Sequence, residues 1–178
     1  RVTAYAQPSN ILRKSHEELR SLKEAGLTMV YVGIESGDAA ILKQIEKGAT
    51  PEEIAASIRK SQEADIDVSA TVLLGLGGRK DSAAHVAGTV EVVNQCSPRY
   101  TSALTLMLLE GAHEERYRSS YPGWELPDIP ELLLEVRGLV DGISVPTTFR
   151  ANHASNYLTI KAELPQDREK TLSRIDHA

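Results

Sequence analysis

The residues with the clearest chemical potential stand where an apolar stretch of the sequence ends. The run Val32 to Ile34 stops at Glu35, Ser36 and Gly37, a carboxylate, a hydroxyl and a glycine, just before a helix is expected. In parallel α/β folds, ligands bind beyond the carboxyl ends of the strands, where loops leave the sheet and helix N-termini offer backbone N–H groups. The sequence therefore predicts a ligand pocket at this strand end.

Each of these polar residues also has a purely structural interpretation. The turn from Glu35 to Asp38 is typical of a helix N-cap, and Lys47 before Gly48 is a common pairing of a cation with a helix C-terminus. The run from Gly75 to Gly78 lacks the third glycine of a dinucleotide-binding loop, so it is a weak nucleotide signal. Both interpretations stay open at this point.

The elements that must position these residues alternate along the chain. Strand-like runs alternate with amphipathic helices, which indicates βα units and a parallel sheet. Strands are expected at 2–6, 28–34, 67–74, 101–108 and 146–150. The expected helices are one capped by Ser15 and closed by Gly26, a short one from Asp38 to Gly48, one beginning at Thr50 and Pro51, one after Gly78, a short polar one within 111–127, one opened by Pro130, and a terminal one after Pro165.

The two faces of the expected strands differ in character. Side chains alternate across a strand, so one set faces the covering helices and the other faces the opposite side. The second set is small or polar: Thr3, Tyr5 and Gln7; Tyr31, Gly33 and Glu35; Ser69, Thr71 and Leu73; Thr105 and Met107. A flat doubly wound sheet would be apolar on both faces. The pattern favours an α/β fold of the partial (β/α) TIM-like barrel type, whose inner face is a ligand cavity.

Composition limits the classes of function. The 178 residues carry a net charge of -5 and suit one domain, with βα units over 1–150 and a polar segment plus terminal helix over 151–178. Nucleic-acid binding by this segment is disfavoured, and no run approaches the length of a membrane span. The single cysteine, Cys96, fits a reducing cytoplasm and supplies no metal site.

Two further groups of polar residues receive structural interpretations. The histidines His16, His85, His113 and His177 have no partners at ligand spacing, and we interpret them as surface residues. The segment from Asn152 to Tyr157 is rich in short hydrogen-bonding side chains. It is either a network of turns or a lid across the cavity mouth.

Several motifs in order resemble one enzyme family. They are 2–8 (VTAYAQP), 31–37 (YVGIESG), 71–78 (TVLLGLGG) and 103–107 (ALTLM). Together they resemble the later strands of radical S-adenosylmethionine (SAM) enzymes, in the group that includes oxygen-independent coproporphyrinogen oxidase and the tRNA-modifying Elongator-type enzymes. The resemblance covers nearly the whole chain to about Leu164.

The resemblance implies roles for individual positions. Glu35 resembles the acidic or amide residue that holds the ribose or amino end of SAM, and Lys47, twelve residues on, resembles the basic residue that reaches the SAM carboxylate. The remaining positions implied to contact SAM are Tyr5, Gln7, Ser36, Thr71, Leu74 with Gly75, and Met107. No catalytic residue is assigned, and the substrate is not implied.

The family's defining CxxxCxxC loop, whose thiolates hold a [4Fe–4S] cluster, is absent from this sequence. We therefore expect this chain to be the later part of a barrel whose cluster loop lies upstream of Arg1. With that loop, the complete enzyme is expected to cleave SAM to a 5′-deoxyadenosyl radical for hydrogen abstraction, whereas this part alone is expected to be inactive. The unpaired first strand also suggests a homodimer through the open barrel edge.

Two other classes of function remain open. One is a barrel lyase or isomerase that needs no cluster and uses Glu35 as its general base. The other is a binding domain without catalysis.

Overall fold

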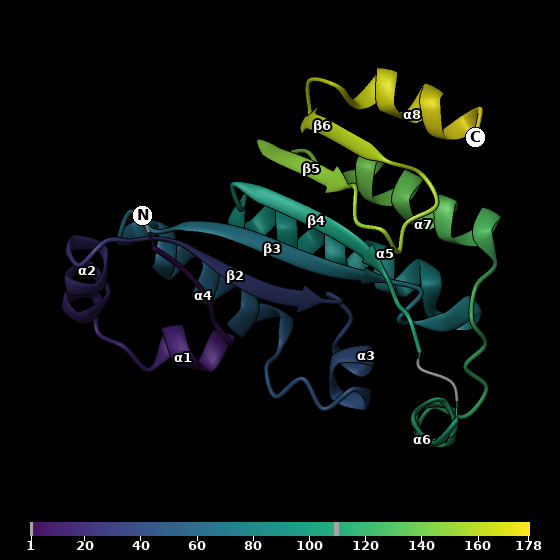
Figure 1. The fold of residues 1–178 in the computed structure, drawn as a ribbon, viewed down its shortest axis with the longest axis horizontal. Coiled ribbons are helices and arrows are strands. Elements are labelled where there is room, and N and C mark those ends of the chain that lie inside the picture. The colour runs from purple at the N-terminus through teal and green to yellow at the C-terminus, as the bar shows by residue number, and fades with distance from the viewer. Residues whose placement is uncertain (1, 109–110) are drawn as a thin grey trace.

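The sheet has six strands that follow one another in sequence order. The computed structural model describes residues 2–108 and 111–178. The strands are β1 (Val2–Tyr5), β2 (Leu27–Glu35), β3 (Asp67–Leu74), β4 (Tyr100–Thr105), β5 (Thr147–Ala151) and β6 (Ile160–Leu164). Strands β1 to β5 pair in parallel, and β6 is antiparallel to β5 (Figure 1). The expected partial barrel with a parallel sheet is confirmed, although β6 was not expected.

Helices lie between successive strands from β1 to β5, and loops join them to the strands. The helices are α1 (Pro8–Leu12), α2 (His16–Glu24), α3 (Ala39–Gln44), α4 (Pro51–Glu63), α5 (Gly78–Cys96), α6 (Ala112–Ser120), α7 (Ile129–Gly142) and α8 (Arg168–Asp176). The helix starts follow the sequence closely, because Ser15, Asp38 and Thr50 each accept a hydrogen bond from the first turn of their helix, as expected of N-caps. The short α1 was not expected.

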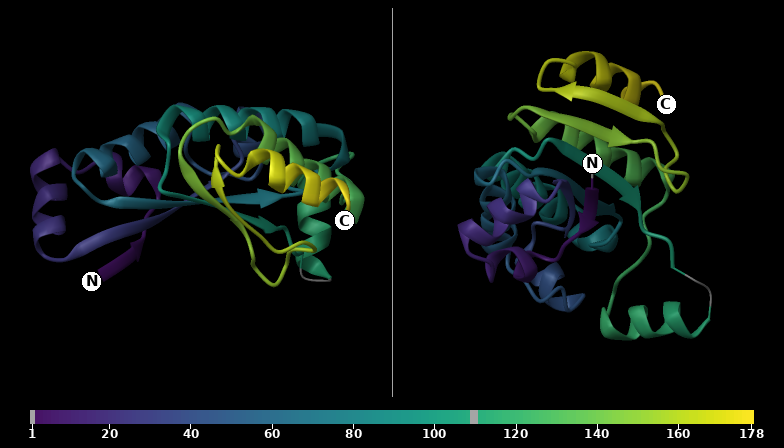
Figure 2. Two further views of the ribbon diagram at one scale, coloured as in Figure 1. Left: turned by 90° about the horizontal axis from the view of Figure 1, so that it is seen from above. Right: turned by 60° about the vertical axis from the view of Figure 1, so that its left-hand side comes forward.

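One face of the sheet is buried beneath helices. Figure 2 shows α4, α5 and α7 lying along one face, while most of the opposite face has no covering helix. On the covered side the strands contribute fully buried Val32, Val68, Val72 and Phe149 to the core. The opposite face therefore forms the inner surface of the partial barrel, as the alternation of side chains predicts.

The inner face contains rows of residues in register across the strands. One row joins Tyr5, Tyr31, Ser69, Tyr100 and Thr148, and the next joins Gly33, Thr71, Ser102 and Arg150. The inner set expected for the fourth strand is wrong by one residue. Because Thr71 pairs with Ser102, the inner residues of β4 are Tyr100, Ser102 and Leu104, and Thr105 belongs to the helix side. The Thr-Ser-Ala-Leu-Thr run reads equally well in either register, since both sets mix small and apolar residues.

The segment from Asn152 to Tyr157 is a network of turns. Asn156 Oδ1 accepts hydrogen bonds from the Thr105 N–H at 2.9 Å and the Thr105 hydroxyl at 3.0 Å. Its amide nitrogen donates to the Ala103 carbonyl at 2.8 Å. Strands β4 and β5 pair only as far as Ser102 and Arg150, so the Asn156 amide supplies the hydrogen bonds that the neighbouring strand no longer provides.

Among the described helices, none is both long and apolar enough to cross a membrane.

Candidate functional site

Glu35 is held in an unusual backbone conformation at the end of β2. Its φ is 61°, and the Ser36 N–H donates to the Ile34 carbonyl at 2.8 Å, which closes a three-residue turn around it. The register between β2 and β3 shifts at the same place, between Gly33 and Glu35. A residue with a side chain rarely adopts this conformation unless the surrounding structure imposes it, and such strain is common at functional sites.

Lys47 reaches Glu35 because of the way in which α3 ends. The helix ends at Gln44, earlier than the expected Gly48, and Glu46 takes a left-handed conformation with a φ of 54°. The Lys47 N–H then donates to the Leu42 carbonyl at 2.9 Å, the pairing of a Schellman motif. This turn reverses the chain and returns Lys47 toward the end of β2.

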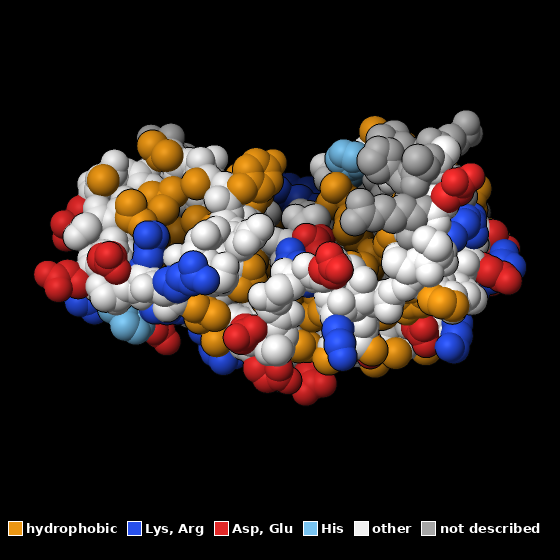
Figure 3. All heavy atoms as spheres, turned by 90° about the horizontal axis from the view of Figure 1, so that it is seen from below, with side chains coloured by type: hydrophobic (Ala, Val, Ile, Leu, Met, Phe, Trp, Pro, Cys, Tyr) orange, Lys and Arg blue, Asp and Glu red, His pale blue; other side chains and the backbone are white. Residues whose placement is uncertain are grey.

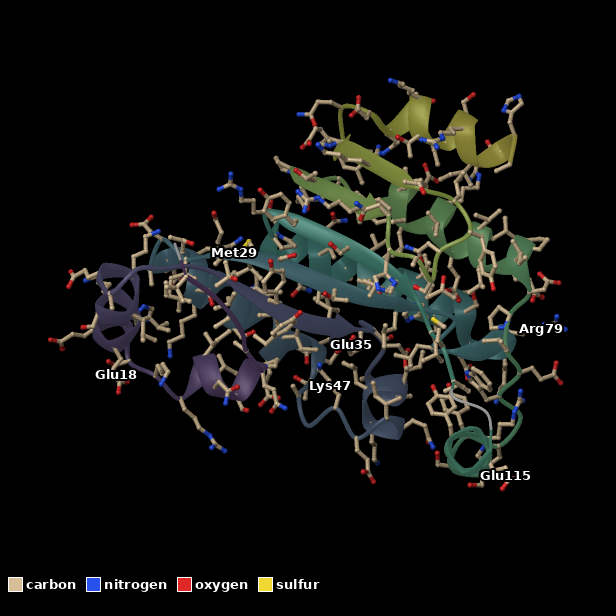
Figure 4. The ribbon with its side chains drawn as sticks, in the orientation of Figure 1. Glu18, Met29, Glu35, Lys47, Arg79 and Glu115 are labelled. Carbon is tan, nitrogen blue, oxygen red and sulfur yellow. The ribbon has the colours of Figure 1, made fainter. Side chains whose placement is uncertain are left out.

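The two side chains form an ion pair over a glycine. Lys47 Nζ lies 2.9 Å from Glu35 Oε1, and the side chains are 15% and 22% exposed. Figure 4 shows the pair beside the end of β2. A Cβ atom on Gly33 would lie 2.0 Å from Glu35 Oε1 and 2.9 Å from Lys47 Nζ, so a larger residue at this position would displace the two charged groups from the positions that they occupy here.

Other expected site residues lie on or near the same inner face. The half-buried Thr71 is next to Gly33 in the strand register. Tyr5 is 90% exposed, and the centre of its ring lies 5.1 Å from that of Tyr31. Gln7 is exposed and precedes α1 as its N-cap residue.

Two expected residues are placed differently from that set. Met107 is 72% exposed and lies beyond the last residue of β4, because the strand ends at Thr105 and does not extend to the expected 108. Leu74 is 1% exposed and faces the helices, so of this residue only the backbone borders the loop that follows β3.

The loop after β3 is held by a buried carboxylate that the sequence interpretation missed. Glu135 of α7 is 1% exposed, and its Oε2 accepts a hydrogen bond from the Gly75 N–H at 2.7 Å. Its Oε1 accepts from the Ser82 hydroxyl at 2.7 Å. Burial raises the pKa of Glu135, while the two hydrogen bonds lower it less. A signal was present, because Glu135 lies on the same face of its helix as the apolar Leu132 and Leu139.

Ser36 points beneath the loop rather than onto the inner face. It is fully buried, and its hydroxyl oxygen lies 2.9 Å from His85 Nδ1 and accepts a hydrogen bond from the Asp38 N–H at 3.1 Å. Burial lowers the pKa of His85 to about 4, so the imidazole is neutral at pH 7. The expectation of a surface position for His85 is therefore wrong, whereas His16 and His177 are exposed and the side chain of His113 lies outside the described residues.

The described part of the chain lacks the ligands for an iron–sulfur cluster. Within it, no group of three or more His, Cys, Asp or Glu side chains could hold a metal ion. Cys96 is 4% exposed, and its thiol donates to the Val92 carbonyl at 3.0 Å. Burial raises the pKa of this thiol to about 12, which suppresses the thiolate form that binds metals.

The partial barrel and the polar strand ends define a class of α/β protein that binds its ligand at the carboxyl ends of the strands. The sequence profile of the Radical SAM superfamily matches residues 4–93, which is half of the chain. The chain therefore belongs to the radical SAM superfamily. No match is found among curated protein sequences.

Solved structures of similar fold include one that is described as a radical SAM enzyme. The chain is 14% identical to coproporphyrinogen III oxidase from Escherichia coli, with a TM-score of 0.62 over 80% of this chain and 32% of that one. It is 15% identical to the archaeal Elp3 of Methanocaldococcus infernus, with a TM-score of 0.67 over 97% and 41%. Methylornithine synthase gives 14% identity and a TM-score of 0.53 over 98% and 56%. The chain thus spans from 32% to 56% of the length of these proteins, and the likeness is one of fold.

Proposed function

We propose that this chain is the SAM-binding part of a radical SAM enzyme, and the Glu35–Lys47 ion pair is the observation that carries the proposal. In this proposal Lys47 binds the carboxylate of SAM, and Glu35 binds its amino group or ribose. The pair lies at a strand end, over a glycine. Glu35 itself has a left-handed backbone conformation, and Lys47 follows the left-handed Glu46. This arrangement holds a cation and an acceptor ready for a ligand that carries both charges.

The remaining site residues take supporting roles in the proposal. The Thr71 hydroxyl and the exposed Tyr5 and Gln7 offer polar contacts, while the backbone at Leu74 and the exposed Met107 border the adenine. We assign Ser36 to the support of the Glu35 turn, because its hydroxyl is engaged by His85. Bound SAM, together with a [4Fe–4S] cluster, supplies radical chemistry for hydrogen abstraction.

The cluster ligands of the proposed enzyme must come from outside the residues of this chain, since it contains one cysteine. We accordingly propose that the chain alone is inactive and that the complete enzyme works in the cytoplasm, where cysteine thiols stay reduced. The test is calorimetric titration of the complete, cluster-loaded protein with SAM. A cluster-independent lyase that uses Glu35 as a base would instead show activity without any cluster.

The isolated chain should take up no [4Fe–4S] cluster after reconstitution with iron and sulfide. A buried, protonated thiol supplies at most one ligand, and such clusters need several thiolates. Bound iron and visible absorbance should equal those of a Cys96→Ser variant treated in the same way. Stoichiometric iron in the unaltered chain alone would contradict the expectation.

The isolated chain should also self-associate through β1, the proposed homodimer edge. Within residues 2–108 and 111–178, strand β1 pairs only with β2, and a groove of about 530 Å³ beside it has a mostly apolar lining that includes Ala4, Ile11 and Leu22. Figure 3 shows hydrophobic side chains gathered at the end of the molecule that contains α1 and α2. An unpaired edge next to an apolar groove favours pairing with a second chain.

Light scattering at increasing protein concentration measures this association. Ala4→Lys places a charge in the groove and should shift the chain toward monomer. Thr159→Lys, at an exposed site next to β6 at the other edge of the sheet, should leave the association unchanged. A monomer at all concentrations would refute the edge contact.

A further inference from the structure

The inner face carries two cations side by side at the far end of the row that begins at Gly33, the glycine beneath the Glu35–Lys47 pair. Arg150 on β5 pairs directly with Lys161 on β6, in register with Gly33, Thr71 and Ser102. Buried Ile160 and Ala162 flank Lys161 in the sequence and face the helices, so Lys161 lies on the inner side. Arg150 and Lys161 are called the cation pair below.

Neither cation is neutralised by a carboxylate. Within residues 2–108 and 111–178, no ion pair is formed by Arg150 or Lys161. The Arg150 guanidinium instead lies 4.1 Å from the centre of the Tyr100 ring, which orients it across the inner face. Glu163, the acidic residue on the same side of β6, accepts a hydrogen bond from the Thr148 hydroxyl at 2.8 Å.

A directly opposed pair of like charges destabilises a sheet, and within the described residues no carboxylate forms an ion pair with either cation to offset this repulsion. An anion between the two side chains would supply that contact. A guanidinium held flat by an aromatic ring presents two parallel N–H donors, which match the paired oxygens of a carboxylate or a phosphate.

The position of the cation pair suits a second ligand group beside SAM. Three strand spacings separate Gly33, which lies under the Glu35–Lys47 pair, from Arg150, a distance of about 14 Å. The residues between them in the row are Thr71 and Ser102, whose small side chains leave space above the sheet between the two ends of the row. One end of the row thus offers a matched ion pair and the other offers uncompensated positive charge.

We propose that Arg150 and Lys161 form a subsite for an anionic group, a carboxylate or a phosphate, of the substrate. The identification of the ligand as the substrate rests on the proposed function, whereas anion binding at the cation pair does not require SAM. The proposal predicts that the hydrogen-abstraction substrate of the complete enzyme is acidic.

The test measures the stabilisation of the chain by two probes, inorganic phosphate and succinate, in thermal unfolding titrations at constant ionic strength. At least one probe should raise the Tm of the unaltered chain with a saturable dependence on concentration. Arg150→Gln should weaken the apparent affinity roughly tenfold, the loss expected for a charge-assisted hydrogen bond. Lys161→Gln should weaken it as well, and Lys170→Gln, an exposed lysine on α8, serves as the matched control with no effect.

A second measurement keeps the proposal falsifiable if Arg150→Gln folds poorly. In a buffer without either probe, Lys161→Gln should hold or raise the Tm, because it removes a like-charge contact. A fall in Tm, or equal probe binding by the unaltered chain and by Lys161→Gln, would overturn the subsite.

The titrations distinguish a phosphate group from a carboxylate, and they test the anion subsite separately from the proposed SAM site. Stronger binding of phosphate identifies a phosphorylated substrate, and stronger binding of succinate identifies a carboxylate. If the complete protein binds no SAM but the anion titration depends on Arg150, the proposed function fails and the subsite stands. If SAM binds and neither probe depends on Arg150, the subsite fails alone.

Discussion

Alanine at Glu35 or at Lys47 should weaken SAM binding by the complete, cluster-loaded protein roughly tenfold to a hundredfold. Each change removes a charge-assisted hydrogen bond worth about 1.5–3 kcal/mol, and each also leaves the other member of a 2.9 Å ion pair without its partner. The pair is mostly buried, so water replaces the lost contact poorly. Calorimetric titration with SAM measures the effect directly.

Three variants serve as controls for this result. Glu35→Gln keeps an acceptor but loses the charge, so it should lose less affinity than Glu35→Ala. Lys43→Ala removes an exposed cation of α3 without touching the site. Gly33→Ala leaves both charges in the sequence but places a Cβ 2.0 Å from Glu35 Oε1, which displaces the carboxylate, so it should also weaken binding. Unaltered affinity in both alanine variants at Glu35 and Lys47 would show that SAM binds elsewhere.

Glu135→Ala is expected to lower the free energy of unfolding by roughly 2–4 kcal/mol. The change leaves the Gly75 N–H and the Ser82 hydroxyl without their acceptor, and an unsatisfied buried donor costs about 1–3 kcal/mol. Urea unfolding at pH 7 measures the loss. Glu131→Ala, one turn earlier on the same helix at a half-buried position, should have a smaller effect, because its contacts with Arg79 and with the Asp128 N–H are solvent-exposed.

Glu135→Gln separates the hydrogen bonds from the charge. Its amide oxygen can accept from Gly75 while its nitrogen donates to Ser82, so the packing and both contacts are kept. The pKa of Glu135 is raised in the folded state, so its titration favours folding below the ordinary carboxyl pKa of about 4.3, and this contribution is lost as pH rises through the folded pKa.

Relative to the unaltered chain, the Gln variant should therefore gain stability between acidic and neutral pH. Parallel unfolding curves at pH 4 and pH 7 measure this difference. A Gln variant that is as unstable as Glu135→Ala at both pH values would contradict the role assigned to the two hydrogen bonds.

Much of the local structure could be predicted because it depends on neighbours in the sequence. Ser15, Asp38, Thr50 and their helices followed from caps that act over two or three residues, and β3 has the predicted bounds. Strand β6 could have been found as well, since apolar residues alternate at Ile160, Ala162 and Leu164. The opposite orientation of β6 depends on its pairing with β5 and not on its own residues.

The same distinction between local and long-range determinants applies to the candidate site. The sequence by itself determined that polar residues end β2, that one face of the sheet is small and polar, and that a single cysteine supplies no cluster. These properties depend on residue type and on the two-residue period of a strand, which any folded form must share.

Only the tertiary structure decided which distant groups meet. Glu135 contacts Gly75 across 60 residues, His85 contacts Ser36 across 49, and the register that brings Ser102 rather than Thr105 to the inner face exists only once β3 and β4 pair. Arg150 and Lys161 become neighbours in the same way, through the pairing of β5 with β6. Such contacts are set by strand register and helix docking, in which a shift of one residue exchanges the two faces of a strand, and no local pattern along the chain contains that information.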